Sequence, residues 1–255
     1  FSVSGSITWL YYSDRLMEFP VGILGVALST VILPRLSRRQ AESAPETFSR
    51  ELDWGLRTAF VFGVPAAVGL VMLAGPMMAT LFQSDVFDAH DVAMAQRSLM
   101  AYGLGLQAFV LIKVLAPGFY ARQDTRTPVR IGMIAMAANM VLNLLFIYPL
   151  QHAGLALATS LGAYLNAFLL LRGLRRDAVY HPVDGWRRLA LQVGVAALVL
   201  AGMIASISPD LAVWVTADRG QRVLWLVGLV VGGVASYLGV LWLAGARLRD
   251  LHSQR

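Results

Sequence analysis

Three ionisable residues, Asp14, Arg15 and Glu18, stand beside a run of apolar residues long enough to cross a bilayer. In a helix, Arg15 can reach Glu18 three positions on, and Asp14 shares a face with Glu18. A charge inside a membrane is costly unless it is paired or faces water, so two interpretations are open. The group either snorkels to the headgroups at the end of a span, or it lines a wet cavity where the planar donors of Arg15 bind an anion such as a phosphate.

Lys113 is a second candidate for anion binding. It precedes Arg122 by nine residues, which places it roughly 13 Å into an apolar helix from the basic end. A lysine stem spans only part of that depth. Because Pro117 and Gly118 between them would open the helix to water, we expect Lys113 to face the cavity.

Asn139 and Asn143 are expected to share a face of one helix, with Thr159 on the next helix. Their oxygens could help to hold a small hard cation such as sodium, although two amides without a carboxylate make a weak site. Hydrogen bonding between helices explains the same three residues, and both interpretations stay open.

Asp85, Asp88 and Asp91 lie in one acidic loop and could serve an enzyme that acts on lipid-linked sugars. No second acidic cluster accompanies them, so we expect a solvated loop in which Asp91 caps the following helix. The chain has no cysteine, and its four histidines fall in separate loops without the spacing of a metal site. We therefore predict no catalytic residue, no metal site and no cofactor.

The composition indicates the elements that must position these residues. With 57% hydrophobic and only 14% charged residues, the chain is too apolar for an ordinary soluble domain. Long apolar runs without alternation favour helices over a transmembrane barrel. We predict an all-α polytopic membrane protein with about seven transmembrane helices. The runs are Leu16–Leu33, Thr58–Phe82, Leu99–Ala121, Val129–Leu150, Gly154–Leu171, Leu189–Ile207 and Val223–Ala246.

Two of these runs carry small residues at four-residue steps, which predicts close packing on a neighbouring helix. Gly154, Ala158 and Gly162 form the first stripe, which ends at Asn166. The second stripe consists of Gly228, Gly232 and Ser236. Neither stripe indicates a ligand.

Most of the basic residues lie in alternate loops. By the positive-inside rule these loops and the C-terminus are cytoplasmic, and seven spans then place the N-terminus outside. The net charge of +6 therefore needs no nucleic-acid partner. The chain begins without Met and reaches a span almost at once, so we expect a fragment. The basic residues in question are Arg35, Arg38, Arg39, Arg50, Arg57, Arg122, Arg126, Arg130, Arg172, Arg175, Arg176, Arg187, Arg188, Arg247, Arg249 and Arg255.

Three segments together carry a family resemblance. They read "GSITWLYYSDRLMEFPVGILGVALSTVILPRLSR", "KVLAPGFYARQDTRTPVRIG" and "HAGLALATSLGAYLNAFLLLRGLRR". They closely resemble the MurJ (MviN) family of lipid II flippases, within the multidrug/oligosaccharidyl-lipid/polysaccharide (MOP) exporter superfamily. The resemblance covers nearly the whole chain, although the last two spans match in hydropathy more than in motif.

The resemblance implies two six-helix lobes around a central cationic cavity, followed by two extra helices that form a groove for a lipid tail. On this chain, residues 1–175 would be most of the second lobe, with about five transmembrane helices. Residues 176–188 would be a cytoplasmic linker, and residues 189–255 the two extra helices with a short cytoplasmic tail. The first lobe would be absent.

The resemblance also implies a function, that of moving lipid II from the cytoplasmic to the outer leaflet of the bacterial inner membrane by alternating access, without covalent chemistry. Arg15 matches a cavity arginine that would bind the pyrophosphate, and Asp14 and Glu18 match the acidic residues beside it. Coupling to sodium or to the membrane potential is expected. The partners would be lipid II, membrane lipids and cell-wall synthesis or division proteins. Export of another lipid-linked oligosaccharide or of drugs is the alternative.

Overall fold

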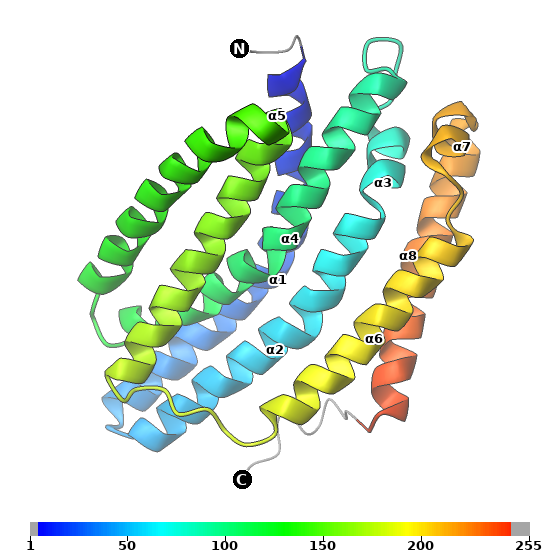
Figure 1. Ribbon diagram of the computed structural model, residues 1–255. Coiled ribbons are helices and arrows are strands. Elements are labelled where there is room, and N and C mark those ends of the chain that lie inside the picture. Colours follow the sequence, from blue (N-terminus) through cyan, green and yellow to red (C-terminus); the bar gives the residue numbers. More distant parts are fainter. Residues whose placement is uncertain (1–4, 246–255) are drawn as a thin grey trace.

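The computed structural model describes residues 5–245, which form helices and no strand (Figure 1). Six of the helices in this range are long and apolar enough to cross a membrane, and α3 and α7 are short. The predicted all-helical membrane fold is confirmed. The helices are α1 (Ser6–Ala41), α2 (Pro45–Met72), α3 (Ala74–Leu81), α4 (Ala89–Tyr120), α5 (Arg126–Arg176), α6 (Trp186–Ile207), α7 (Leu211–Thr216) and α8 (Arg219–Leu243).

Helix α5 is a hairpin of two antiparallel limbs, 126–150 and 152–176, which meet at one end of the molecule (Figure 1). The chain reverses at Gln151, whose φ of 51° and ψ of −130° are not helical, two residues after Pro149. A Cβ at Gly154 would overlap the carbonyl oxygen of Phe146, so the limbs close tightly only because position 154 has no side chain. The two limbs correspond to two of the seven predicted runs.

Helices α1 to α5 pack into one bundle, which we call the lobe; α4 lies at its centre and packs against α1, α2 and α5. Small residues allow these close contacts: a Cβ at Gly105 would lie 2.7 Å from the Cα of Ser160 on α5, and a Cβ at Gly55 on α2 would lie 2.9 Å from Val114 on α4. Helices α6 and α8 pack on each other and, as a pair, on α2 and α3.

The stripe of small residues predicted in the second limb of α5 does pack closely, because Gly154 and Gly162 both contact the first limb. The stripe predicted in α8 is right only in part: a Cβ at Gly232 would meet Met203 of α6 at 3.7 Å, an ordinary contact. Gly228 has no atom within 4 Å of a Cβ built there, whereas Gly233, one position after the predicted Gly232, meets Leu200 of α6 at 2.8 Å. The buried stripe of α8 therefore runs through Leu229, Gly233 and Tyr237, with Gly232 at its margin.

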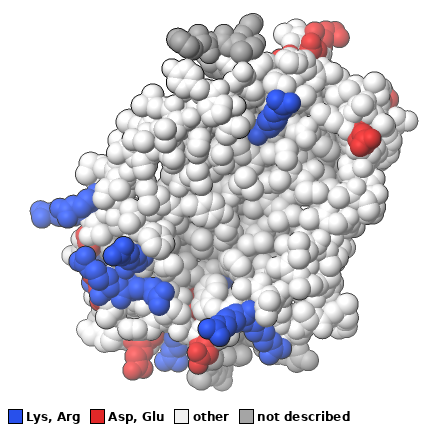
Figure 2. Space-filling view, in the orientation of Figure 1, with Lys and Arg blue, Asp and Glu red and all other residues white. Residues whose placement is uncertain are grey.

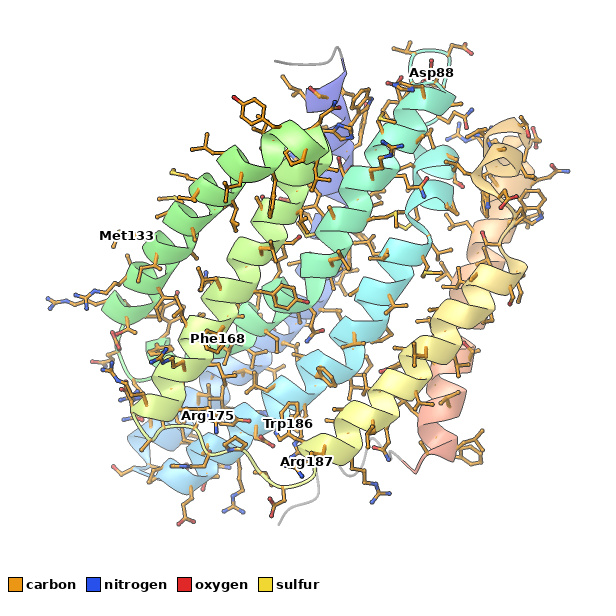
Figure 3. The ribbon with its side chains drawn as sticks, viewed as in Figure 1. Asp88, Met133, Phe168, Arg175, Trp186 and Arg187 are labelled. Atoms are coloured by element: carbon orange, nitrogen blue, oxygen red, sulfur yellow. The ribbon has the colours of Figure 1, made fainter. Side chains whose placement is uncertain are left out.

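The two ends of the helix bundle differ in charge. Figure 2 shows the Lys and Arg side chains of the visible face gathered mainly at the end where α5 finishes and α6 begins. Asp88 lies at the opposite end, and Arg175, Trp186 and Arg187 lie at the basic end (Figure 3). The predicted tail at Arg247, Arg249 and Arg255 lies outside the described residues.

Candidate functional site

Arg15 and Glu18 form an ion pair on α1. The Arg15 Nη1 atom donates to Glu18 Oε2 at 3.0 Å, and the two side chains are 59% and 55% exposed. The guanidinium carbon of Arg15 also lies 5.2 Å from the ring centroid of Tyr11, one turn earlier. The pair uses one donor of a guanidinium that has five, so most of the anion-binding capacity of Arg15 remains open.

The face of α1 around this pair is not covered by the other described residues. It carries large apolar side chains that are more than half exposed, Ile7, Phe19, Ile23 and Val26 among them. The opposite face is buried: Ser13 donates to the carbonyl oxygen of Ala95 on α4 at 2.9 Å. Helix α1 therefore presents the Arg15 pair outward from the lobe. We call this exposed side of α1 the Arg15 face.

The other two residues predicted to bind the anion, Asp14 and Lys113, lie in different environments. Asp14 is half-buried at the margin of the Arg15 face. Lys113 is exposed, and its stem lies against Gly25 of α1. Since Gly25 follows Arg15 by ten residues, Lys113 meets α1 about 15 Å along the helix from Arg15. The structure therefore does not join Lys113 to the Arg15 pair in one cluster; it places the two cations at two depths.

The three residues of the candidate ion site lie on the two limbs of the α5 hairpin, Asn139 and Asn143 on the first and Thr159 on the second. Asn139 packs on Gly162, where a Cβ would lie 3.2 Å from the Asn139 Cβ, and the antiparallel limbs then bring Asn143 level with Thr159. The Oδ1 atoms of Asn139 and Asn143 are buried without a donor among the described residues. The Thr159 hydroxyl donates to the carbonyl oxygen of Leu155 at 2.9 Å and keeps its lone pairs.

The acidic loop has a structural role. Asp88, and not the predicted Asp91, is the N-cap of α4: its carboxylate accepts from the backbone N–H of Asp91 at 3.0 Å, and the Asp91 carboxylate accepts in return from the N–H of Asp88 at 3.1 Å. Asp91 also accepts from the Trp9 indole at 2.6 Å, which ties α4 to the start of α1. Both carboxylates are thus engaged in holding helices.

Asp53, on α2, holds a buried ion pair that was not predicted from the sequence. Its side chain is 4% exposed and pairs with Arg57 at 2.6 Å. It also accepts from the Tyr180 hydroxyl at 2.7 Å and the Trp186 indole at 2.8 Å. Arg57 in turn donates to the carbonyl oxygen of Val183 at 2.8 Å. We call these five residues the Asp53 cluster; they fasten the segment between α5 and α6 to α2.

Tyr180 is held as a donor in this cluster. Burial, together with its hydrogen bond to the Asp53 carboxylate, raises the pKa of Tyr180 far above its ordinary value of about 10. The hydroxyl therefore remains protonated throughout the physiological range and keeps donating to Asp53.

The α6–α8 pair is attached to the lobe at two further levels. Tyr237 of α8 donates to the carbonyl oxygen of Val61 on α2 at 2.6 Å. Arg222, at the start of α8, donates to the carbonyl oxygens of Ala79 in α3 and Val215 in α7, each at 2.9 Å. Together with the Asp53 cluster, these contacts fix the pair along its whole length.

The fold and the site define a class: a multi-pass α-helical membrane protein that presents an ion-paired arginine on an uncovered helix face. A sequence profile described as "Lipid II flippase MurJ" matches residues 1–238. The chain belongs to this family.

Individual relatives agree with the profile. The chain is 48% identical to the probable lipid II flippase MurJ of Vibrio cholerae, over 98% of this chain and 48% of that protein. It is 44% identical to the lipid II flippase MurJ of Burkholderia cenocepacia, over 94% and 47%. A solved structure titled "Lipid II flippase MurJ, inward closed conformation" shares the fold, with a TM-score of 0.78 and 24% identity over 97% of this chain and 48% of that one. The chain spans about half the length of the relatives it matches.

Proposed function

We propose that this chain forms one part of a transporter that moves lipid II from the cytoplasmic to the outer leaflet of the bacterial inner membrane. Its basic end and its C-terminus would face the cytoplasm, as the positive-inside rule requires. Family membership supports the substrate. One observation supports Arg15 as the binding residue: its side chain is more than half exposed and pairs with a single carboxylate, on a helix face that the other described residues leave uncovered.

In this proposal Arg15 binds the pyrophosphate that links the sugar headgroup to its lipid. A guanidinium presents donors in a planar fork that matches phosphate oxygens two at a time. Glu18 holds the fork and balances its charge while no headgroup is bound. When the headgroup arrives, the phosphate binds the donors that Glu18 leaves free and then displaces Glu18 from Nη1. Because this exchange replaces one charged acceptor by another, the charge of Arg15 is never unpaired within the membrane.

The test of the proposal is lipid II binding by the full-length protein that contains this chain. Arg15→Gln is expected to weaken binding about tenfold or more, the loss of a charge-assisted hydrogen bond worth about 1.5–3 kcal/mol. Arg219→Gln, at an exposed arginine at the start of α8, is the matched control and should bind as the wild type. Equal binding by both variants would contradict the site. Equally good competition by drugs or by other lipid-linked oligosaccharides would favour the alternative exporter.

We also propose that two sources of energy act on this cycle. The cytoplasm is negative, so moving about two phosphate charges outward is favoured by roughly 4 to 5 kcal/mol per 100 mV. The second source is sodium, bound between the limbs of α5 by Asn139, Asn143 and Thr159. The two buried amide oxygens without a protein donor support this position, because unsatisfied oxygens suit a hard cation.

Vesicles that contain the full-length protein separate the two sources. A potential that is positive on the receiving side should speed lipid II movement, and replacing sodium by potassium should slow it. Asn139→Leu should remove the response to sodium and leave the response to the potential; Asn166→Leu, on the other limb, is the control. A rate of lipid II movement that depends on neither the potential nor sodium would contradict this part of the proposal.

A further inference from the structure

We infer that Gly25 is a positioning residue, which lets the Lys113 amine reach the Arg15 face. Lys113 is then a second cationic residue that binds the phosphates of the headgroup. This inference rests on the proposed function and adds a residue to it. Lys113 is the only lysine in the chain, and it is exposed although it lies within a helix long and apolar enough to span a membrane.

The Lys113 stem passes over the backbone of α1 at Gly25. A Cβ built on Gly25 would lie 2.8 Å from the Cγ of Lys113, 3.5 Å from its Cβ and 3.7 Å from its Cδ. The first distance is shorter than a van der Waals contact, and the atom concerned is in the middle of the stem. Any side chain at position 25 would therefore occupy the path that the stem takes. Gly25 itself is buried.

The direction expected for the stem follows from the course of the two helices. Gly25 follows Glu18 by seven residues, two helical turns, so both lie on one stripe of α1. Helices α1 and α4 both run toward the basic end (Figure 1), and side chains lean toward the N-terminus of their helix. Lys113 therefore leans from the level of Gly25 toward that of Glu18.

The separation of about 15 Å along α1 exceeds what one pyrophosphate can bridge, so Arg15 and Lys113 act one after the other. A headgroup that enters from the basic end would meet Lys113 first and Arg15 second. Among the described residues, no ion pair within 4.0 Å involves Lys113, so its charge stays available to a phosphate.

The first arm of the test measures the position of Lys113 directly. Its modification by a water-soluble amine reagent is quantified by mass spectrometry on the peptide that contains it, in the full-length protein. Gly25→Val is expected to lower this modification several-fold. Gly22→Val is the matched control, because a Cβ at Gly22 has no atom within 4 Å and modification should stay at the wild-type level. Equal modification in all three proteins would overturn the inference.

The second arm measures lipid II exposure at the outer face of cells. Lys113→Met keeps the stem and removes the charge, so exposure should fall about tenfold, whereas Lys113→Arg should restore most of it. The double variant Gly25→Val with Lys113→Met should be no worse than Lys113→Met alone, because Gly25 acts through the lysine. Normal exposure in Lys113→Met, or an additive loss in the double variant, would overturn the inference.

The two arms separate this inference from the function on which it rests. If the wild type fails to expose lipid II, the proposed function is wrong, and the amine modification alone still decides whether Gly25 positions Lys113. If Gly25→Val does not insert into the membrane, Gly25→Ala takes its place in the first arm, because its Cβ alone would lie 2.8 Å from the Lys113 Cγ. The comparison of Lys113→Met with Lys113→Arg, neither of which alters α1, then decides the role of the charge. Similar exposure in those two variants would overturn the role of the charge.

Discussion

Asp53→Ala is expected to lower the stability of the protein by about 3–5 kcal/mol and to release the segment between α5 and α6. Removing one partner of a buried ion pair leaves the other charge without compensation, which accounts for this magnitude. Here the loss is compounded, because the Tyr180 hydroxyl and the Trp186 indole also lose their acceptor. Arg57 is 17% exposed and would keep only its carbonyl partners.

The measurement is the unfolding temperature of the detergent-solubilised full-length protein, together with protease cleavage within residues 177–185. Asp184→Ala is the matched control, because Asp184 is exposed and contributes a backbone carbonyl to Arg57 that the substitution keeps. We expect a lower unfolding temperature and faster cleavage for Asp53→Ala only. An unfolding temperature equal to that of the control would show that the Asp53 cluster does not hold the α6–α8 pair.

Gly105→Val is expected to separate α4 from α5 and to cost about 1–3 kcal/mol or more, as overpacking of a core does. Already the first added carbon would lie 2.6 Å from the Cβ and 2.7 Å from the Cα of Ser160. Because the Cα belongs to the backbone, only a shift of the whole helix relieves the contact. That shift would also break the hydrogen bond from Ser160 to the carbonyl oxygen of Ala101, now 2.7 Å.

Gly132→Ala is the control for this prediction, because a Cβ at Gly132 has no atom within 4 Å. It should leave the protein unchanged or stabilise it by up to about 1 kcal/mol, since alanine is the better helix former. Both predictions are tested by comparing the unfolding midpoints of the wild type, Gly105→Val and Gly132→Ala. A Gly105→Val protein as stable as wild type would mean that α4 and α5 do not approach as closely as described.

The long helices could be predicted from the sequence because their signal is local. Apolar length and bounding charges suffice to place a span, and six of the predicted runs correspond to α1, α4, the two limbs of α5, α6 and α8. The run Thr58–Phe82 was predicted as one helix, whereas the structure divides it between α2, which ends at Met72, and α3, which begins at Ala74. The pair between Arg15 and Glu18 follows from their spacing on one helix and is present. The stripe of small residues that begins at Gly154 likewise predicted a close helix contact, and it is present between the two limbs of α5.

The missed features depend on residues far apart in the chain. The spacing of Asp53 and Arg57 could have indicated an ion pair, but Tyr180 lies 127 residues from Asp53, and nothing local points to it. The buried stripe of α8 was predicted only in part because glycines occur on several of its sides, and only the neighbour decides which of them, here Gly233, is used. Lys113 could be flagged from sequence, whereas its path over Gly25 could not.

Cells that lack their own flippase and carry the full-length protein show whether Arg15 lies on the path of the lipid II headgroup. Lipid II exposed at the outer face is measured for the wild type and for Arg15→Ala, with membrane insertion of both verified. Our account predicts that exposure collapses in Arg15→Ala while insertion is normal. Unchanged exposure would contradict it and would make the charged group an anchor at the membrane interface.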